Sequence, residues 1–224
     1  MEFLVWAPVL LFSVVAHEYA HAEAAYRQGD DTAYMLGRLT LNPLKHIDPI
    51  MSVVVPFILW RLGAPVFGAA KPVPVNPRKY RNFRRGDIIV SLAGIVANLA
   101  LFVASAMLFV VAGLLAAGLP ALTPTFEIVQ RMLYYGMWLN LILAFFNLIP
   151  IPPLDGSHVF YYLLPPGAGL KYRQLQALGF MPILLVAWAF PGVLRLLLWP
   201  AVQLMGAGWS VVGRFAISQG VIPT

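Results

Sequence analysis

The chain has 224 residues, of which 60% are hydrophobic and 11% are charged, and its mean hydropathy is +0.79. Soluble domains carry about 25% charged residues, so this composition excludes an ordinary soluble protein and predicts an integral membrane protein. Cysteine is absent, which excludes disulfides and thiolate metal sites. The net charge of +6 does not indicate nucleic-acid binding, because six of the fifteen basic residues lie between Ala70 and Gly86. Short basic loops beside apolar segments mark the cytoplasmic face of a membrane.

The first apolar segment runs from about Phe3 to Tyr26 and predicts a membrane-spanning helix. It is preceded by Glu2 and by no basic residue, so we expect it to be retained rather than removed as a signal peptide. The next apolar stretch, Ile50–Trp60, is shorter than the roughly 20 residues that a crossing requires, and it contains Pro56. It therefore predicts a re-entrant or interfacial segment.

Three further apolar segments complete the predicted bundle. Ile88–Leu119 and Ile128–Ile149 are each long enough to cross a membrane, and a proline-rich stretch ends the second of them. A last span is expected around Leu175–Leu198, with Pro191 and Gly192 as a candidate break, and the tail to Ser218 suits the membrane interface.

Two short segments alternate polar and apolar residues as β-strands do, RLTLN at 38–42 and KPVPVN at 71–76. Pro72 and Pro74 remove backbone donors, so the second segment suits the edge of a sheet. The predicted fold class is an all-α polytopic membrane protein, a transmembrane helix bundle with a short membrane-associated β-hairpin or re-entrant segment. We expect a single domain over residues 1–224.

Within this domain a metal-binding core is expected at about 3–160 and C-terminal helices at about 170–218. If the basic loop is cytoplasmic, the following span runs outward and the next returns inward, which places Asp155 near the cytoplasmic face. His17 and His21 reach the same depth if the N-terminus is outside and the short apolar stretch does not cross.

The segment HEYAH at 17–21 is an H-E-x-x-H motif near the end of the first span. Helix positions four apart share a face, so His17 and His21 can bind one Zn²⁺. Glu18 points about 100° further round the helix axis, toward a water on the metal rather than toward the metal. Three ionisable groups in apolar sequence cost several kcal/mol unless they satisfy one another, which a shared metal achieves better than isolated hydrogen bonds to neighbouring helices.

A catalytic zinc site has three protein ligands and an open position. Asp155 is the best candidate for the third ligand, because it alone follows a returning span and begins a new helix after a proline break. His46 is expected to be a loop residue. His158 could reach the site, although a supporting or surface role suits it better.

The chain resembles the site-2 protease family of intramembrane zinc metalloproteases, in its compact bacterial and archaeal branch, through four blocks in the family's order: HEYAHAEAAYRQGDDTAYMLGRLTLNPLKHIDP, AAKPVPVNP, SLAGIVAN and FNLIPIPPLDG. The resemblance covers about residues 12–156. It implies that His17, His21 and Asp155 bind one zinc ion per chain and that Glu18 is the catalytic acid and base.

The same resemblance implies that Asn147 and the helix carrying Gly94 and Asn98 help to hold the substrate. Taken by themselves, the two amides equally suit hydrogen bonds between helices. The chain departs from the family at Ile95, where proline is usual, and no PDZ or CBS module is expected.

These observations predict an intramembrane zinc metalloendopeptidase that hydrolyses peptide bonds within or near transmembrane segments. Zinc would lower the pKa of its water and polarise the scissile carbonyl, and Glu18 would carry the proton to the leaving amine. One alternative is a divalent-metal transporter or metal-dependent membrane sensor, which would place ligands across the membrane rather than in one cluster. Another is an inactive scaffold, against which the intact motif speaks.

A protease needs an extended substrate, because the backbone of an intact helix is internally bonded. The RLTLN segment, with Thr40 at its centre, would hold such a substrate by β-augmentation, unless the hairpin only packs over the membrane surface. Expected partners are the lipid bilayer and transmembrane proteins, including membrane-anchored regulators such as anti-sigma factors, and no nucleic acid. The protein is expected in the plasma or inner membrane as a multi-pass protein with its active site toward the cytoplasm.

Overall fold

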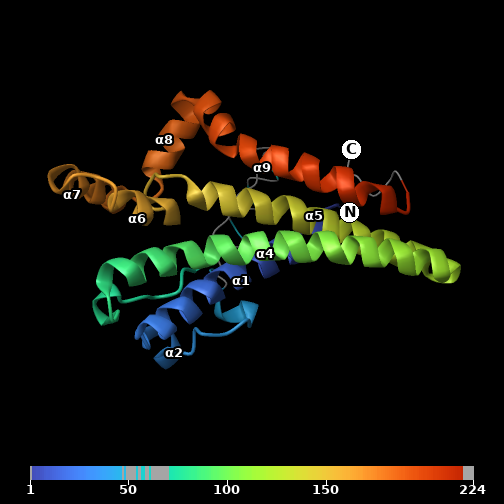
Figure 1. Ribbon diagram of the computed structural model, residues 1–224, viewed down its shortest axis with the longest axis horizontal. Helices are drawn as coiled ribbons and strands as arrows, with labels where there is room; N and C mark the ends of the chain where they lie inside the picture. The colour runs from blue at the N-terminus through green and yellow to red at the C-terminus, as the bar shows by residue number, and fades with distance from the viewer. Residues whose placement is uncertain are drawn as a thin grey trace. The chain divides into compact units, whose positions relative to one another are not determined.

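The computed structural model describes residues 2–46 and 71–218, together with positions 48, 54, 57, 58 and 61 (Figure 1). The described residues form α-helices joined by turns, short 3₁₀ helices and extended loops, and no strand occurs among them. The helices in chain order are α1 (Glu2–Gln28), α2 (Thr32–Met35), η1 (Pro43–Lys45), η3 (Pro77–Lys79), α4 (Phe83–Gly118), η4 (Pro120–Leu122), α5 (Thr123–Leu148), α6 (Asp155–Tyr161), α7 (Pro166–Gln174), η5 (Leu175–Leu178), α8 (Met181–Ala189), α9 (Pro191–Val212) and η6 (Gly213–Phe215).

Three of the described helices are long and apolar enough to cross a membrane: Glu2–Gln28, Phe83–Gly118 and Pro191–Phe215. The protein is therefore an all-α membrane protein, as the sequence predicts. The first predicted span is confirmed as α1, and the second begins five residues earlier than expected. The third predicted span, Ile128–Ile149, is helical within α5 (Thr123–Leu148), although α5 is not among the three.

Helix α1, which carries HEYAH, ends directly before a glycine. The N–H of Gly29 donates to the Tyr26 carbonyl at 3.0 Å, and the N–H of Asp30 donates to the Ala25 carbonyl at 2.9 Å. Gly29 has φ +108°, which L side chains rarely adopt. The chain therefore turns sharply after α1 and directs the polar segment that follows back along the helix.

The C-terminal span was placed wrongly by the sequence. The expected helix around 175–198 is divided among η5, α8 and α9. The long apolar helix is α9, which continues to Val212, well into the tail that was assigned to the interface. The candidate break is confirmed, because Pro191 is the first residue of α9 after the non-helical Phe190. Proline fits the first turn of a helix, where its missing N–H needs no partner, and so begins a helix there.

The described chain forms two compact units, one made of Met1–Ser13 and Ile95–Thr224 and the other of Val14–Gly94. In the first unit α5 packs along α9 (Figure 1). The core of this unit consists of apolar side chains from α4, α5 and α9: Phe109, Met137, Leu141, Ala201, Met205 and Val212.

In the second unit, small and medium side chains pack between the end of α1, the start of α4 and the loops that join them. Ala22, Ala33 and Val73 form one cluster, and Ala25, Tyr80 and Val90 form another. Alanines on α1 allow the chain to approach this helix closely. The C-terminal part of α1 is therefore held against segments that follow it by 50 residues or more.

The predicted hairpin is not confirmed. Neither 38–42 nor 71–76 is a strand. The segment 71–76 belongs to the second unit and contains neither helix nor turn. The predicted re-entrant segment Ile50–Trp60 lies outside the described residues except at positions 54, 57 and 58.

Candidate metal centre

The two histidines of HEYAH converge in the second unit. They lie one turn apart on α1, and their Nε2 atoms are 3.0 Å from each other. The two rings stand nearly perpendicular, with centroids 4.5 Å apart and an interplanar angle of 85°. His17 is buried and His21 is half-buried. The expected sharing of one helix face by these two side chains is therefore confirmed.

The start of α4 fixes the orientation of His21. The Nδ1 atom of His21 lies 2.7 Å from the carbonyl oxygen of Val90. Because that oxygen can only accept, Nδ1 carries the proton and Nε2 keeps its lone pair. Hydrogen bonds of this kind hold metal-binding histidines in the correct tautomer.

Gly94, one turn further along α4, leaves room for both imidazoles. A Cβ atom at this position would lie 2.5 Å from Cε1 of His17 and 2.6 Å from Nε2 of His21. No side chain can occupy that space while the two rings stay in place. The helix that carries Gly94 is predicted to help hold substrate, and the structure places Gly94 itself beside the imidazoles.

The histidine pair fits zinc. Two nitrogens bound at about 2.0–2.1 Å to one tetrahedral zinc ion lie about 3.3 Å apart, close to the separation in this protein. The two Nε2 atoms lie close enough for one ion, and the hydrogen bond to the Val90 carbonyl is made by the other ring nitrogen of His21, Nδ1. Imidazole nitrogens suit zinc, as they also suit copper, iron and nickel.

Glu18 lies between the histidines in sequence and contacts a different segment. Its Oε2 accepts a hydrogen bond from the backbone N–H of Val73 at 2.7 Å, and its side chain is half-buried. A short bond to a carboxylate is a strong one, because the acceptor is charged. One carboxylate oxygen of Glu18 is therefore held by the chain.

Asp155 belongs to the first unit, where it is the first residue of α6. A Cβ atom on the next residue, Gly156, would lie 2.1 Å from the carbonyl oxygen of Leu148, so the turn that carries Asp155 packs directly on the end of α5. The predicted helix start after the proline break is confirmed. The role of Asp155 as the third ligand stays a prediction.

The amides predicted to hold substrate make hydrogen bonds inside the protein. Asn98 is fully buried, and its Nδ2 donates to Oδ1 of Asn140 at 2.8 Å. Asn140 in turn donates to Oγ of Ser13 at 2.9 Å. Asn147 donates to the Leu143 carbonyl of its own helix at 3.0 Å. The structure thus adds Asn140 and Ser13, which the sequence did not single out, to the neighbourhood of Asn98.

Of the remaining candidates, Thr40 and His46 lie in a polar loop and His158 lies in α6. The carbonyl oxygen of Thr40 accepts from Nε2 of His46 at 2.8 Å, and His46 is fully buried. His46 is therefore a loop residue, as predicted, and its ring bonds to the backbone of the same loop. Nε2 of His158 lies 3.3 Å from the amide nitrogen of Gln176, which fits a supporting or surface role.

The comparisons with known proteins point in one direction. Residues 5–186 match the model of a family described as peptidase family M50. YwhC of Bacillus subtilis (strain 168), named as a candidate zinc metalloprotease, is 39% identical over 196 residues, which cover 85% of this chain and 82% of that protein. Rip2 of Mycobacterium tuberculosis (strain H37Rv), named in the same way, is 34% identical over 214 residues, or 92% of this chain and 78% of that protein.

Rip2 of Mycolicibacterium smegmatis, also named as a candidate zinc metalloprotease, is 32% identical over 181 residues. These residues cover 79% of this chain and 63% of that protein. None of the solved structures matches the chain significantly.

Proposed function

The chain belongs to peptidase family M50, and on that premise we propose that it is an intramembrane zinc metalloprotease that acts through its HEYAH helix. The observation that carries this proposal is the convergence of the two Nε2 atoms, 3.0 Å apart, on a helix long and apolar enough to cross a membrane. Glu18 lies between the two histidines in the motif and accepts a hydrogen bond from the Val73 amide of the same compact unit. The resemblance to the site-2 proteases, seen in the sequence, is confirmed by this family.

Each residue has a defined task in peptide hydrolysis. His17 and His21 hold the zinc ion, and the Val90 carbonyl keeps His21 in the required tautomer. When bound, zinc supplies a Lewis acid that polarises a carbonyl and acidifies water. Glu18 accepts the proton of the attacking water at its carboxylate and donates it to the leaving amine.

Asp155 is proposed as the third ligand, giving one zinc ion per chain. Two histidines alone leave a catalytic zinc site one protein ligand short. A carboxylate at the start of α6 sits on a turn fixed against the end of α5, which suits a ligand that must not move. The sequence pattern PLDG supports the assignment.

The substrates are proposed to be transmembrane proteins, including membrane-anchored regulators such as anti-sigma factors. Asn98, Asn147 and Thr40 remain the candidates for contacting them. The segments 38–42 and 71–76 would pair with an extended substrate, which is compatible with the extended course of 71–76. The hairpin is thus proposed for the substrate-bound protein.

We place the protein in the plasma or inner membrane as a multi-pass protein, with its N-terminus outside and its active site toward the cytoplasm. The basic residues between 70 and 86 support this orientation, because they directly precede the apolar part of α4. The alternative of a divalent-metal transporter or sensor is not favoured, because the family is one of peptidases.

The test is to measure zinc content and cleavage in the same preparations. The probe is a tagged single-span model helix with a glycine-proline centre, reconstituted with the protein. His17→Ala and His21→Ala should lose zinc, whereas Glu18→Gln should keep zinc and lose cleavage, because it keeps the shape and removes the base. Cleavage by Glu18→Gln at the wild-type rate would refute the mechanism, and full zinc occupancy in Asp155→Ala would remove that ligand.

A further inference from the structure

An extended strap, residues Lys71–Asn76, runs through the second unit. Hydrogen bonds from its backbone amides hold it in place. Its two prolines leave four amides, those of Lys71, Val73, Val75 and Asn76. Three of the four make hydrogen bonds to distant groups: Lys71 to the His46 carbonyl at 2.8 Å, Val73 to Glu18 at 2.7 Å and Asn76 to Asp30 at 2.5 Å.

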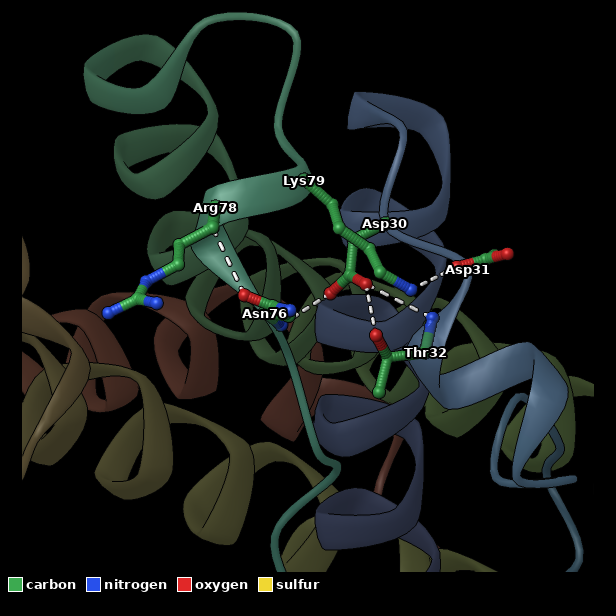
Figure 2. A network of polar contacts seen from close by, with 6 residues as sticks. All are labelled: Asp30, Asp31, Thr32, Asn76, Arg78 and Lys79. Carbon is green, nitrogen blue, oxygen red and sulfur yellow. Dashed lines mark hydrogen bonds and ion pairs between the residues drawn. The ribbon is translucent and has the colours of Figure 1, made fainter.

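Two buried charged side chains hold the strap at its ends. Asp30 is fully buried and uses Oδ2 for the Asn76 amide and Oδ1 for the amide and hydroxyl of Thr32 (Figure 2). Arg38, which is 9% exposed, donates through Nη2 to the Lys71 carbonyl at 2.8 Å. Burying a charge is costly unless it is well bonded, so these contacts are a strong constraint on the strap.

The middle of the strap meets the catalytic motif. Pro72 and Pro74 have no N–H, so both neighbours of Val73 in the strap lack a backbone donor. That amide binds Oε2 of Glu18, and the Val73 side chain packs on Ala22 and Ala33. A shift of the strap by one residue would therefore present a proline to Glu18 and lose the bond.

The contacts form a closed ring. α1 carries Glu18, the turn after α1 carries Asp30, the strap connects Asn76 to Val73, and Val73 returns to Glu18. Asp30 is twelve residues beyond Glu18, so the ring includes the last turns of α1. It therefore holds the Glu18 carboxylate against α1. One oxygen of Glu18 is occupied by this bond, and the other stays available for proton transfer.

We infer that Asp30 and Arg38 are positioning residues for Glu18, which act through the strap and its Val73 amide. This inference rests on the proposed role of Glu18 as acid and base. It assigns a function to the polar segment that follows HEYAH and carries Asp30 and Arg38. Neither zinc binding nor proton transfer uses this segment directly. The two residues do not touch substrate or metal in this scheme; they orient the group that moves the proton.

Hydrogen exchange of the strap gives a readout that does not depend on activity. Asp30→Asn replaces one acceptor oxygen with an amide group that faces the donor, so the amides of 71–76 should exchange at least about tenfold faster. The matched control is Asp31→Asn, because Asp31 is adjacent and exposed and bonds to the Lys79 side chain rather than to the strap. Its strap amides should exchange as in the wild type. Equal exchange in Asp30→Asn and Asp31→Asn would overturn the inference.

Kinetics on the tagged model helix then separate positioning from folding. Asp30→Asn should lower kcat by about 10- to 100-fold, the usual effect of losing an outer-sphere partner, with KM and zinc content unchanged. Val73→Pro removes the amide itself and should lower kcat as much, and the double variant should be no worse than the more affected single variant. Val73→Ala keeps the amide and should lose less.

The outcomes distinguish this inference from the proposed function. If Glu18→Gln is inactive but Asp30→Asn and Val73→Pro keep the wild-type kcat, only the positioning role fails. If Glu18→Gln is active, the proposed function fails first. If Asp30→Asn does not fold, Val73→Pro with normal zinc content decides: wild-type kcat overturns the inference, and a 10- to 100-fold loss supports it. Multiplied losses in the double variant would show two independent defects and would also overturn it.

Discussion

The two compact units satisfy their buried polar groups in different ways. In the unit of residues 14–94, charged side chains bond to the backbone of an extended segment, as Asp30, Arg38 and Glu18 do with the strap. In the other unit, neutral amides join helices: Asn140 bonds to Asn98 and Ser13.

The difference follows from the state of the backbone. A helix satisfies its own N–H and C=O groups, so polar side chains between helices bond mainly to one another or to helix ends. An extended segment with two prolines satisfies none of them internally, and charged groups are the strongest partners for what remains. The unit with the irregular backbone is also the one that carries the HEYAH histidines. We propose that its charged groups support the site there, whereas the amides of the other unit join helices.

The largest expected effect is on zinc affinity, at Gly94, where a side chain would collide with the imidazoles. Gly94→Ala would place a methyl group within 2.6 Å of both imidazoles and should displace them. We expect zinc affinity to fall by about 100-fold, at the upper end of what a disturbed ligand shell costs. Competition with a chelator measures the affinity.

The control for this variant lies on the same helix. A Cβ atom at Gly118 meets nothing within 4 Å, so Gly118→Ala should bind zinc as the wild type does. Undiminished zinc affinity in Gly94→Ala would show that the imidazoles can rearrange freely, and would remove the start of α4 from the support of the site.

A smaller effect is expected from the amides of the other unit. Asn140→Ala removes its bonds to Asn98 and Ser13 and should lower the free energy of unfolding by about 1 kcal/mol, since such bonds within membrane bundles are individually modest. Zinc content of the folded fraction should not change. Denaturation in mild detergent provides the measurement.

Asn147→Ala is the comparison for Asn140→Ala, because the Asn147 amide donates within its own helix. It should affect unfolding less. If Asn140→Ala instead lost zinc at unchanged stability, the distinction between packing amides and site-supporting charges would be wrong.

The sequence predicted correctly those features that depend on a single helix. The 3.6-residue period and the fixed spacing of HEYAH predicted α1 and the sharing of a face by His17 and His21, because both depend on one helix. The span near 175–198 was misplaced because hydropathy alone does not show that Pro191 begins a helix.

Contacts between distant segments could not be read in this way. Glu18 and Val73 are 55 residues apart, and nothing in the alternation of KPVPVN shows that the amide between its prolines binds a carboxylate instead of another strand. The same limit hid the closeness of Gly94 to the imidazoles. The substrate contacts remain predictions, as does the third ligand, Asp155, which the zinc content of Asp155→Ala tests.

The smallest expected effect concerns the surface pair beside Asp30. Nζ of Lys79 donates to Oδ1 of Asp31 at 2.5 Å (Figure 2). This hydrogen bond lowers the pKa of Asp31 below its ordinary value of 3.8 and raises the pKa of Lys79 above its ordinary value of 10.5. Both groups are exposed, so the pair should contribute little and should weaken in salt.

The sign of each shift sets the pH window of this contribution. The unfolded chain protonates Asp31 near 3.8, and the folded chain does so at lower pH, so the stabilisation is complete above 3.8 and is lost as pH falls through the lowered pKa. For Lys79 the stabilisation is complete below 10.5 and is lost as pH rises through the raised pKa. The unfolding midpoints of wild type and Asp31→Asn should therefore differ slightly at neutral pH and coincide at both extremes. A large difference at neutral pH, or one that persists in acid, would show that Asp31 shares the structural task of Asp30, and would make it unsuitable as the control for the strap.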